Sequence, residues 1–209
     1  MIDNYNDVTI EKYLEIKAVI DGGYDDDVTN VKLVSILADM TEDEVGNLNL
    51  TEYHKLNQKL VFLTEMPVQK IVATKYKLGG YELETVLNMK DMTVSQYIDY
   101  QTFVKDLDKY LVEMLSIFLI PKGKKYNEGY DIIEVQKVIR ENLSIVDAMS
   151  MSGFFLLLYQ SLTKATLSSL IRRLKKMKKK MKNQEEIQKM EEAIANLEQS
   201  GVGLDLLTR

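Results

Sequence analysis

The stretch SGFFLLLYQSLTKATLSSLIRRLKKMKKKMKNQEEIQKMEEAIANL, residues 152–197, decides the fold that the sequence predicts. It begins with an apolar run, continues through a block of lysine and arginine, and ends in a segment rich in glutamate. Apolar residues recur within it at spacings of three and four, which is typical of helix. We therefore expect a charged helical extension that leaves a compact, mostly α-helical domain formed by the residues before it.

The apolar run at the start of this stretch predicts a buried helix. From Gly153 to Leu162 almost every residue is apolar, so a helix here must be covered on most sides. The run is far shorter than the roughly 20 apolar residues that cross a bilayer, and the polar Gln160, Thr163 and Lys164 follow at once. We expect it to close the core of a helical domain spanning 1–165, with a subunit interface as the alternative and no membrane partner.

A narrow apolar stripe with basic surroundings follows the run. Its four members are spaced by four, three and four residues, as in a coiled-coil seam, and eight lysines and arginines lie around them. Like charges at this density repel one another, so the helix needs an acidic helix, an acidic surface or a polyanion as partner. The seam consists of Leu170, Leu174, Met177 and Met181, and the basic residues are Arg172, Arg173, Lys175, Lys176, Lys178, Lys179, Lys180 and Lys182.

A second apolar seam lies in the glutamate-rich segment, out of step with the first by one residue. Two arrangements follow from this shift within an extension spanning 166–200. A turn near Asn183 would fold a helical hairpin and lay the glutamates along the lysines, whereas one continuous helix with a local irregularity would leave the basic block for another molecule. Charge and register favour the hairpin, and a tail over 201–209 ends the chain. The second seam consists of Ile187, Met190, Ile194 and Leu197.

Helix caps and one pair of glycines organise the residues before the extension. Two apolar and β-branched runs, 70–78 and 81–87, flank Gly79-Gly80 and predict a tight β-hairpin. An apolar helix is expected over 107–120, where Pro121 ends it. The predicted fold is thus mostly α, with one small β-hairpin at 70–87. Helix starts are indicated by Thr9 before 10–20, by the three capping boxes Thr41 to Glu44, Asn49 to Glu52 and Thr93 to Gln96, and by Ser144 with Asp147; a further helix is expected over 30–40.

The distribution of charge makes nucleic acid a minor candidate partner. The chain of 209 residues carries a net charge of −5, but residues 1–171 hold 17 basic and 26 acidic residues, a net of −9. An acidic body of this kind repels phosphate, so any contact with nucleic acid is confined to the stripe 172–182. The N-terminus has no apolar core typical of a signal peptide, and we expect an intracellular protein.

Candidate catalytic and metal-binding motifs fail when their spacing is tested. Without cysteine there is no disulfide and no thiolate site, and His54 is the only histidine. Asp25 and Asp27 begin like a calcium loop, but its sixth position is Asn30 rather than glycine, so they are better explained as acids at a helix start. Gly123-Lys124 lacks the preceding glycine and following hydroxyl of a phosphate loop. We expect no enzyme activity and no cofactor.

Three short motifs resemble a family of bacteriophage proteins. They are Leu33 to Asp43 (LVSILADMTED), Leu48 to Glu52 (LNLTE) and, after the expected β-hairpin, Met92 to Asp99 (MTVSQYID). In this order they resemble the tail-assembly-chaperone-like structural proteins of tailed bacteriophages, over about residues 9–159. The use of Lys, Asn, Tyr and Met is also similar to that of phages of gut bacteria, including crAss-like phages. The charged extension departs from the family pattern.

The resemblance implies a non-enzymatic structural or assembly protein of the phage tail or portal vertex, acting through helical contacts. Its partners would be other phage structural proteins, with a homo-oligomer expected, in the host cytoplasm during assembly and in the virion. Two alternatives stay open. One is a transient tail assembly chaperone that holds a tape-measure-like protein, and the other is a nucleic-acid-associated protein that uses the stripe 172–182.

Overall fold

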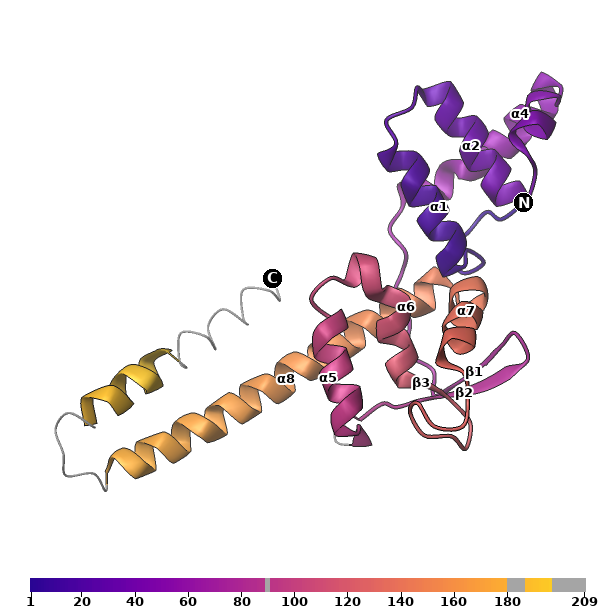
Figure 1. Ribbon diagram of the computed structural model, residues 1–209. Coiled ribbons are helices and arrows are strands. Elements are labelled where there is room, and N and C mark those ends of the chain that lie inside the picture. The colour runs from indigo at the N-terminus through magenta and orange to yellow at the C-terminus, as the bar shows by residue number, and fades with distance from the viewer. Residues whose placement is uncertain (89–90, 180–186, 197–209) are drawn as a thin grey trace. The chain divides into compact units, whose positions relative to one another are not determined.

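The computed structural model describes residues 1–88, 91–179 and 187–196, and Figure 1 shows their helices and strands. It is mostly helical with a small antiparallel sheet, which confirms the predicted fold class. The chain forms two compact units, Met1–Gly153 and Phe154–Arg209. This division comes at the start of the apolar run, whereas the sequence placed the boundary after it, at residue 165. The last helix, α8 (Ile145–Lys178), contributes residues to both units.

Helix caps position the first helices of unit 1 as the sequence predicts. The Thr9 hydroxyl accepts a hydrogen bond from the Lys12 amide at 3.3 Å, and Thr41 with Glu44 forms a complete capping box. The second helix begins at Asp26, four residues before the expected start at Asn30, because the aspartates occupy its first turn, where negative charge is favourable. These elements are α1 (Ile10–Asp21), α2 (Asp26–Ala38), α3 (Glu42–Gly46), α4 (Leu50–Asn57) and the 3₁₀ helix η1 (Gln58–Thr64).

The second part of unit 1 is a three-stranded sheet with helices before and after its last strand. The strand order is β1-β2-β3, with both pairs antiparallel, and Gly79 and Gly80 make the β1–β2 turn with positive φ. The first strand is shorter than predicted and begins at Lys75 instead of residue 70. The elements are β1 (Lys75–Leu78), β2 (Tyr81–Thr85), α5 (Val94–Phe103), α6 (Leu107–Phe118), β3 (Leu119–Pro121) and α7 (Ile132–Asn142).

The third strand corrects the prediction of one helix over 107–120. The helix ends at Phe118, and Leu119 and Ile120 pair with β2. All three residues of β3 are buried, so their apolar sequence carries no alternation that would reveal a strand. Pro121 fits this edge strand because its missing N–H is tolerated there.

The core of unit 1 gathers around α6 and β2. Leu115, Phe118 and Leu83 are fully buried, and the rings of Phe118 and Tyr100 meet edge to face at 5.4 Å.

Two backbone hydrogen bonds connect the start of the chain with the turn before α8. The Ile10 amide donates to the Leu143 carbonyl at 3.1 Å, and the Ile145 amide donates to the Val8 carbonyl at 2.8 Å. The first turns of α8 are therefore held close to the start of α1.

Candidate functional site: a helical hairpin and an apolar groove

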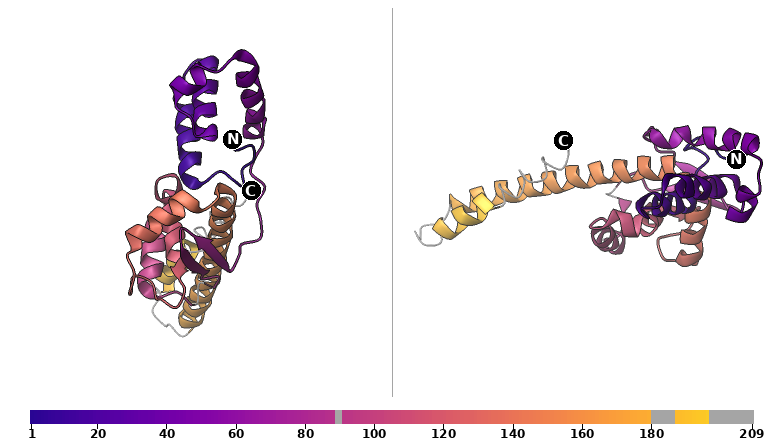
Figure 2. Two further views of the ribbon diagram at one scale, coloured as in Figure 1. Left: turned by 90° about the vertical axis from the view of Figure 1, so that its right-hand side faces the viewer. Right: turned by 90° about the horizontal axis from the view of Figure 1, so that it is seen from above.

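The end of α8 and the helical segment 187–196 form a hairpin in unit 2. The ammonium group of Lys178 forms an ion pair with the carboxylate of Glu191, 13 positions later. In one straight helix these residues would lie about 20 Å apart, so the two segments must fold back on each other. Figures 1 and 2 show segment 187–196 beside the last turns of α8. The predicted turn at Asn183 lies outside the described residues.

The second predicted seam faces α8. Ile194 is buried, and Ile187 and Met190 are the next least exposed residues of segment 187–196. Leu197 lies outside the described residues. The seam therefore supplies the apolar contact of the hairpin, and the ion pair of Lys178 lies beside it.

The first predicted seam divides into a covered and an exposed part. Leu174 is half-buried, whereas Leu170 is 43% exposed and Met177 is 56% exposed. Met181 lies outside the described residues. Ile171, which the seam did not include, is half-buried like Leu174 and Lys178. Segment 187–196 thus covers one edge of the apolar face of α8, and we name the uncovered pair, Leu170 and Met177, the open stripe.

The basic residues lie on two sides of α8. Lys175, Lys178 and Lys179 surround a hollow of about 300 Å³ together with Glu191 and Ile194. A second group, Arg172, Arg173 and Lys176, is exposed and lies more than about 100° around the helix from Lys178. We name these three residues the outer basic group. Lys180 and Lys182 lie outside the described residues.

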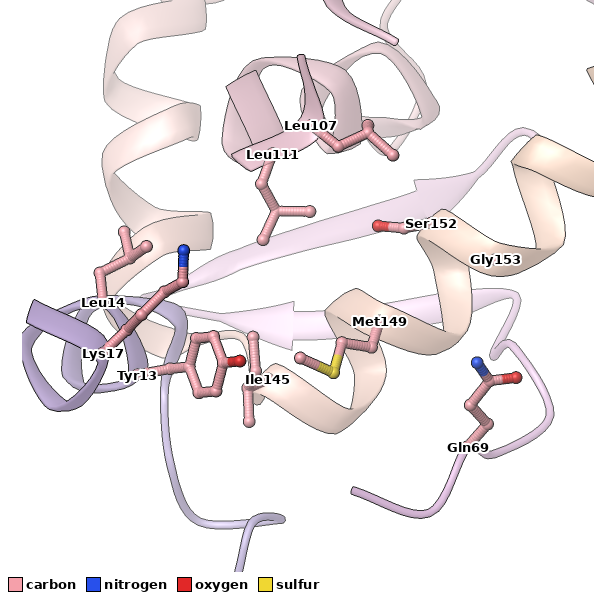
Figure 3. A pocket seen from close by; sticks show the side chains of 10 residues that line it. All are labelled: Tyr13, Leu14, Lys17, Gln69, Leu107, Leu111, Ile145, Met149, Ser152 and Gly153. Carbon is pink, nitrogen blue, oxygen red and sulfur yellow. The ribbon is translucent and has the colours of Figure 1, made fainter. Parts of the chain in front are cut away.

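Unit 1 carries an apolar groove that the sequence did not predict. Two adjoining hollows of about 360 and 570 Å³ share Tyr13, Lys17, Gln69 and Met149. Figure 3 shows the first hollow, where leucines of α1 and α6 face Met149 and Ile145 of α8. We name the two hollows together the α1 groove. Residues that line only the first are Leu14, Leu107, Leu111, Ile145, Ser152 and Gly153, and those that line only the second include Tyr5, Ile16, Ile20, Leu63, Glu65 and Met66.

Several apolar side chains at the second hollow face solvent. Ile20 is 55% exposed and Met66 is 89% exposed. The hydroxyl of Tyr5 donates to the Leu63 carbonyl at 3.3 Å, and burial, followed by the nearby Tyr13 and Glu65, raises the pKa of Tyr5 above its ordinary value. Tyr5 is therefore neutral at physiological pH, and Glu65 supplies negative charge to the groove wall. In the sequence, the feature that could have pointed to this hollow was Met66, the apolar residue before Pro67.

A chain segment with no regular structure borders the groove. The sequence predicted a strand from residue 70, but the segment 65–74 has neither helix nor strand in the structure. The amide of Lys70 donates to the buried hydroxyl of Ser150 at 2.8 Å, which ties the segment to α8. Its side chains Val68 and Ile71 are exposed. Further backbone hydrogen bonds at Ala73 and Thr74 hold its end beside β2, and the segment presents apolar side chains outward.

The titratable groups of unit 1 form local structural contacts. The Tyr126 hydroxyl donates to the Asp99 carboxylate at 2.9 Å, and its pKa is raised by burial and by that carboxylate. His54 is exposed on α4 beside Tyr53. Among the described residues there is no cluster of three or more His, Asp or Glu that could hold a metal ion. None of the described helices combines the length and apolarity needed to cross a membrane.

No family model matches this chain, and comparisons with curated proteins and with solved structures find no match either.

Proposed function

We propose that this protein is a non-enzymatic assembly protein that acts through helix-mediated contacts with other proteins. The observation that carries the proposal is the open stripe of the hairpin. Leu170 and Met177 stand one heptad apart on the surface of α8, and of the outer basic group Arg173 lies closest to them, about 40° around the helix from Met177. Exposed apolar side chains at this spacing suit a second helix, and the flanking cations suit one with acidic edges.

The resemblance of residues 9–159 to tail-assembly-chaperone-like phage proteins supports a more specific form of this proposal. In that form the protein is a bacteriophage structural or assembly component at the tail or portal vertex. Its partners are then other phage structural proteins and further copies of itself. It acts in the host cytoplasm during assembly and stays with the virion if the contacts are permanent.

The α1 groove favours a second candidate, a transient tail assembly chaperone. Its two hollows have mainly apolar walls, and exposed apolar residues such as Met66 and Ile20 lie at the second. A concave apolar surface of this kind can hold the apolar face of an aggregation-prone helix. A tape-measure-like protein, which the resemblance suggests as client, would supply such helices.

Charge reversal of the outer basic group tests the proposal against nucleic-acid binding. Arg172→Glu, Arg173→Glu and Lys176→Glu together should abolish assembly or partner binding in the full chain, measured as a loss of mass by light scattering. A matched control reverses the exposed Lys55, Lys124 and Lys125 of unit 1 and should keep the assembly. Retention on DNA, measured over a salt series, should be the same for both variants. Loss of DNA retention with unchanged assembly would overturn the proposal and favour the nucleic-acid alternative.

A further inference from the structure

The two units of the chain carry opposite net charge. Unit 1, Met1–Gly153, holds 16 basic and 26 acidic residues, a net of −10. Unit 2, Phe154–Arg209, holds the remaining 11 basic and 6 acidic residues, a net of +5. Two copies that meet through the same unit therefore bring like charges together. Two copies that meet through different units bring opposite charges together, which accelerates and orients their association.

Each unit also presents an apolar surface of a complementary kind. The open stripe of unit 2 projects Leu170 and Met177 from one helix, about 10 Å apart along its axis. The α1 groove of unit 1 offers two adjoining hollows of about 360 and 570 Å³, each large enough for a leucine or methionine side chain. A convex helix and a concave groove can bury apolar surface against each other, whereas two convex stripes leave more of it exposed.

Charged groups at the two surfaces agree with this pairing. Glu65 lines the second hollow, and Asp21 forms an ion pair with the lining residue Lys17 at 3.9 Å. Arg173 of the outer basic group lies about 40° around the helix from Met177, so its guanidinium can reach a carboxylate at the groove rim while the stripe fills the hollows.

We propose that the hairpin of one copy docks in the α1 groove of a second copy, open stripe inward. This inference rests on the proposed function and names the partner, a second copy of this chain. The contact joins two different surfaces, so each docked copy still offers a free groove or a free hairpin. Such a heterologous interface closes into a ring or continues as a filament, depending on the rotation between copies.

Two full-length variants that block one surface each test the inference. The groove variant carries Ile20→Lys and Met66→Lys, at positions exposed enough to spare the core, and places cations where the basic hairpin would dock. The stripe variant carries Leu170→Glu and Met177→Glu. Light scattering at low salt should show wild type growing beyond a dimer with concentration, and each variant alone as a monomer. An equimolar mixture should form a dimer, because the groove variant keeps its hairpin and the stripe variant keeps its groove.

Matched controls make the same charge changes elsewhere. Val94→Lys with Ile133→Lys adds two lysines at exposed apolar positions of unit 1 outside the groove. Ser169→Glu with Gln188→Glu adds two glutamates at exposed polar positions of the hairpin. Both controls should assemble like wild type. A circular dichroism spectrum of each variant shows whether it keeps its helical content.

The pattern of masses separates the alternatives. If the groove variant alone forms dimers, the hairpins pair with each other and the inference is overturned. A mixture that stays monomeric while wild type assembles also overturns it. If wild type itself stays monomeric at every concentration and salt, self-docking is overturned. The proposed function is then tested separately, by whether charge reversal of the outer basic group weakens binding of a synthetic amphipathic helix with acidic edges.

Discussion

Replacement of Ile194 by alanine should open the helical hairpin of unit 2. Ile194 is the one buried residue of the described segment 187–196, where its side chain is only 7% exposed. Isolated helices shorter than about 12 to 15 residues are marginal in water. The segment therefore depends on packing against α8, and Ile194 is the most deeply buried of its described residues.

The size of the effect follows from the two contacts that close the hairpin. Truncation of a buried isoleucine to alanine costs about 2–5 kcal/mol in a full core, and we take about 2 kcal/mol for this two-helix contact. The ion pair of Lys178 with Glu191 is partly exposed on both sides, so it contributes less than about 1 kcal/mol and weakens with salt. The apolar contact should therefore dominate the stability of the hairpin.

Amide hydrogen exchange on the full chain measures this difference, because it reports local opening of segment 187–196. At 1.36 kcal/mol per factor of ten, Ile194→Ala should reduce protection about thirtyfold, and Glu191→Gln by at most about fivefold. The exposed Gln188→Ala serves as control and should leave protection unchanged.

Two results would refute the reasoning. If Glu191→Gln reduced protection more than Ile194→Ala, charge rather than apolar packing would close the hairpin. If the amides of the segment exchanged freely in the wild-type chain, the segment would not be packed against α8 at all.

Three further predictions concern unit 1. Gln96→Leu removes a buried amide that donates to the Ile117 carbonyl at 3.0 Å, so the free energy of unfolding in urea should fall by about 1–3 kcal/mol. Gly79→Ala should lower it by about 1 kcal/mol or more, because φ there is +50° and a Cβ would lie 3.0 Å from the Val138 side chain. Glu82→Gln should flatten the loss of stability on acidification, measured by thermal unfolding between pH 6 and about pH 3.

The sign of the third prediction follows from the ion pair of Glu82 with Lys122 at 2.8 Å, which holds the pKa of Glu82 below its ordinary value in the folded chain. Its stabilisation is present above the unfolded-state pKa and is lost as pH falls through the lower folded-state pKa. An equally steep loss of stability on acidification in Glu82→Gln would contradict this assignment.

For Gly79→Ala, the control is Gly46→Ala, because a Cβ at Gly46 meets open space and should not destabilise the chain. For Gln96→Leu, the control is Gln58→Leu at an exposed position, which should change the free energy of unfolding by less than about 0.5 kcal/mol.

Local capping chemistry explains why much of the helical body could be predicted. Thr9, Thr41 and Thr93 each accept a hydrogen bond from the amide three residues later, in the first turn of the helix that follows. Such contacts depend on neighbours in sequence, so their pattern is visible without a fold. The third strand was missed for the opposite reason. Leu119 is a strand residue only because Thr85, more than thirty positions earlier, lies opposite it.

The same contrast applies to the candidate surfaces. The second seam was predicted from its spacing alone, and Ile187, Met190 and Ile194 face inward. The division of the first seam was not predictable, because it depends on which edge of α8 the segment 187–196 covers. The α1 groove was missed entirely. Its walls come from α1, α6, α8 and the segment 63–69, and no periodic pattern connects residues so far apart.

The sequence by itself determined the mostly helical fold, the helix starts and the charge asymmetry, because these depend on contacts within a few residues or on composition alone. The tertiary structure decided which apolar residues stay uncovered. Ile194 and Met177 are both apolar residues of predicted seams, yet one is buried and the other is 56% exposed. Burial depends on what packs across from a side chain, and in this protein that opposite surface comes from distant parts of the chain.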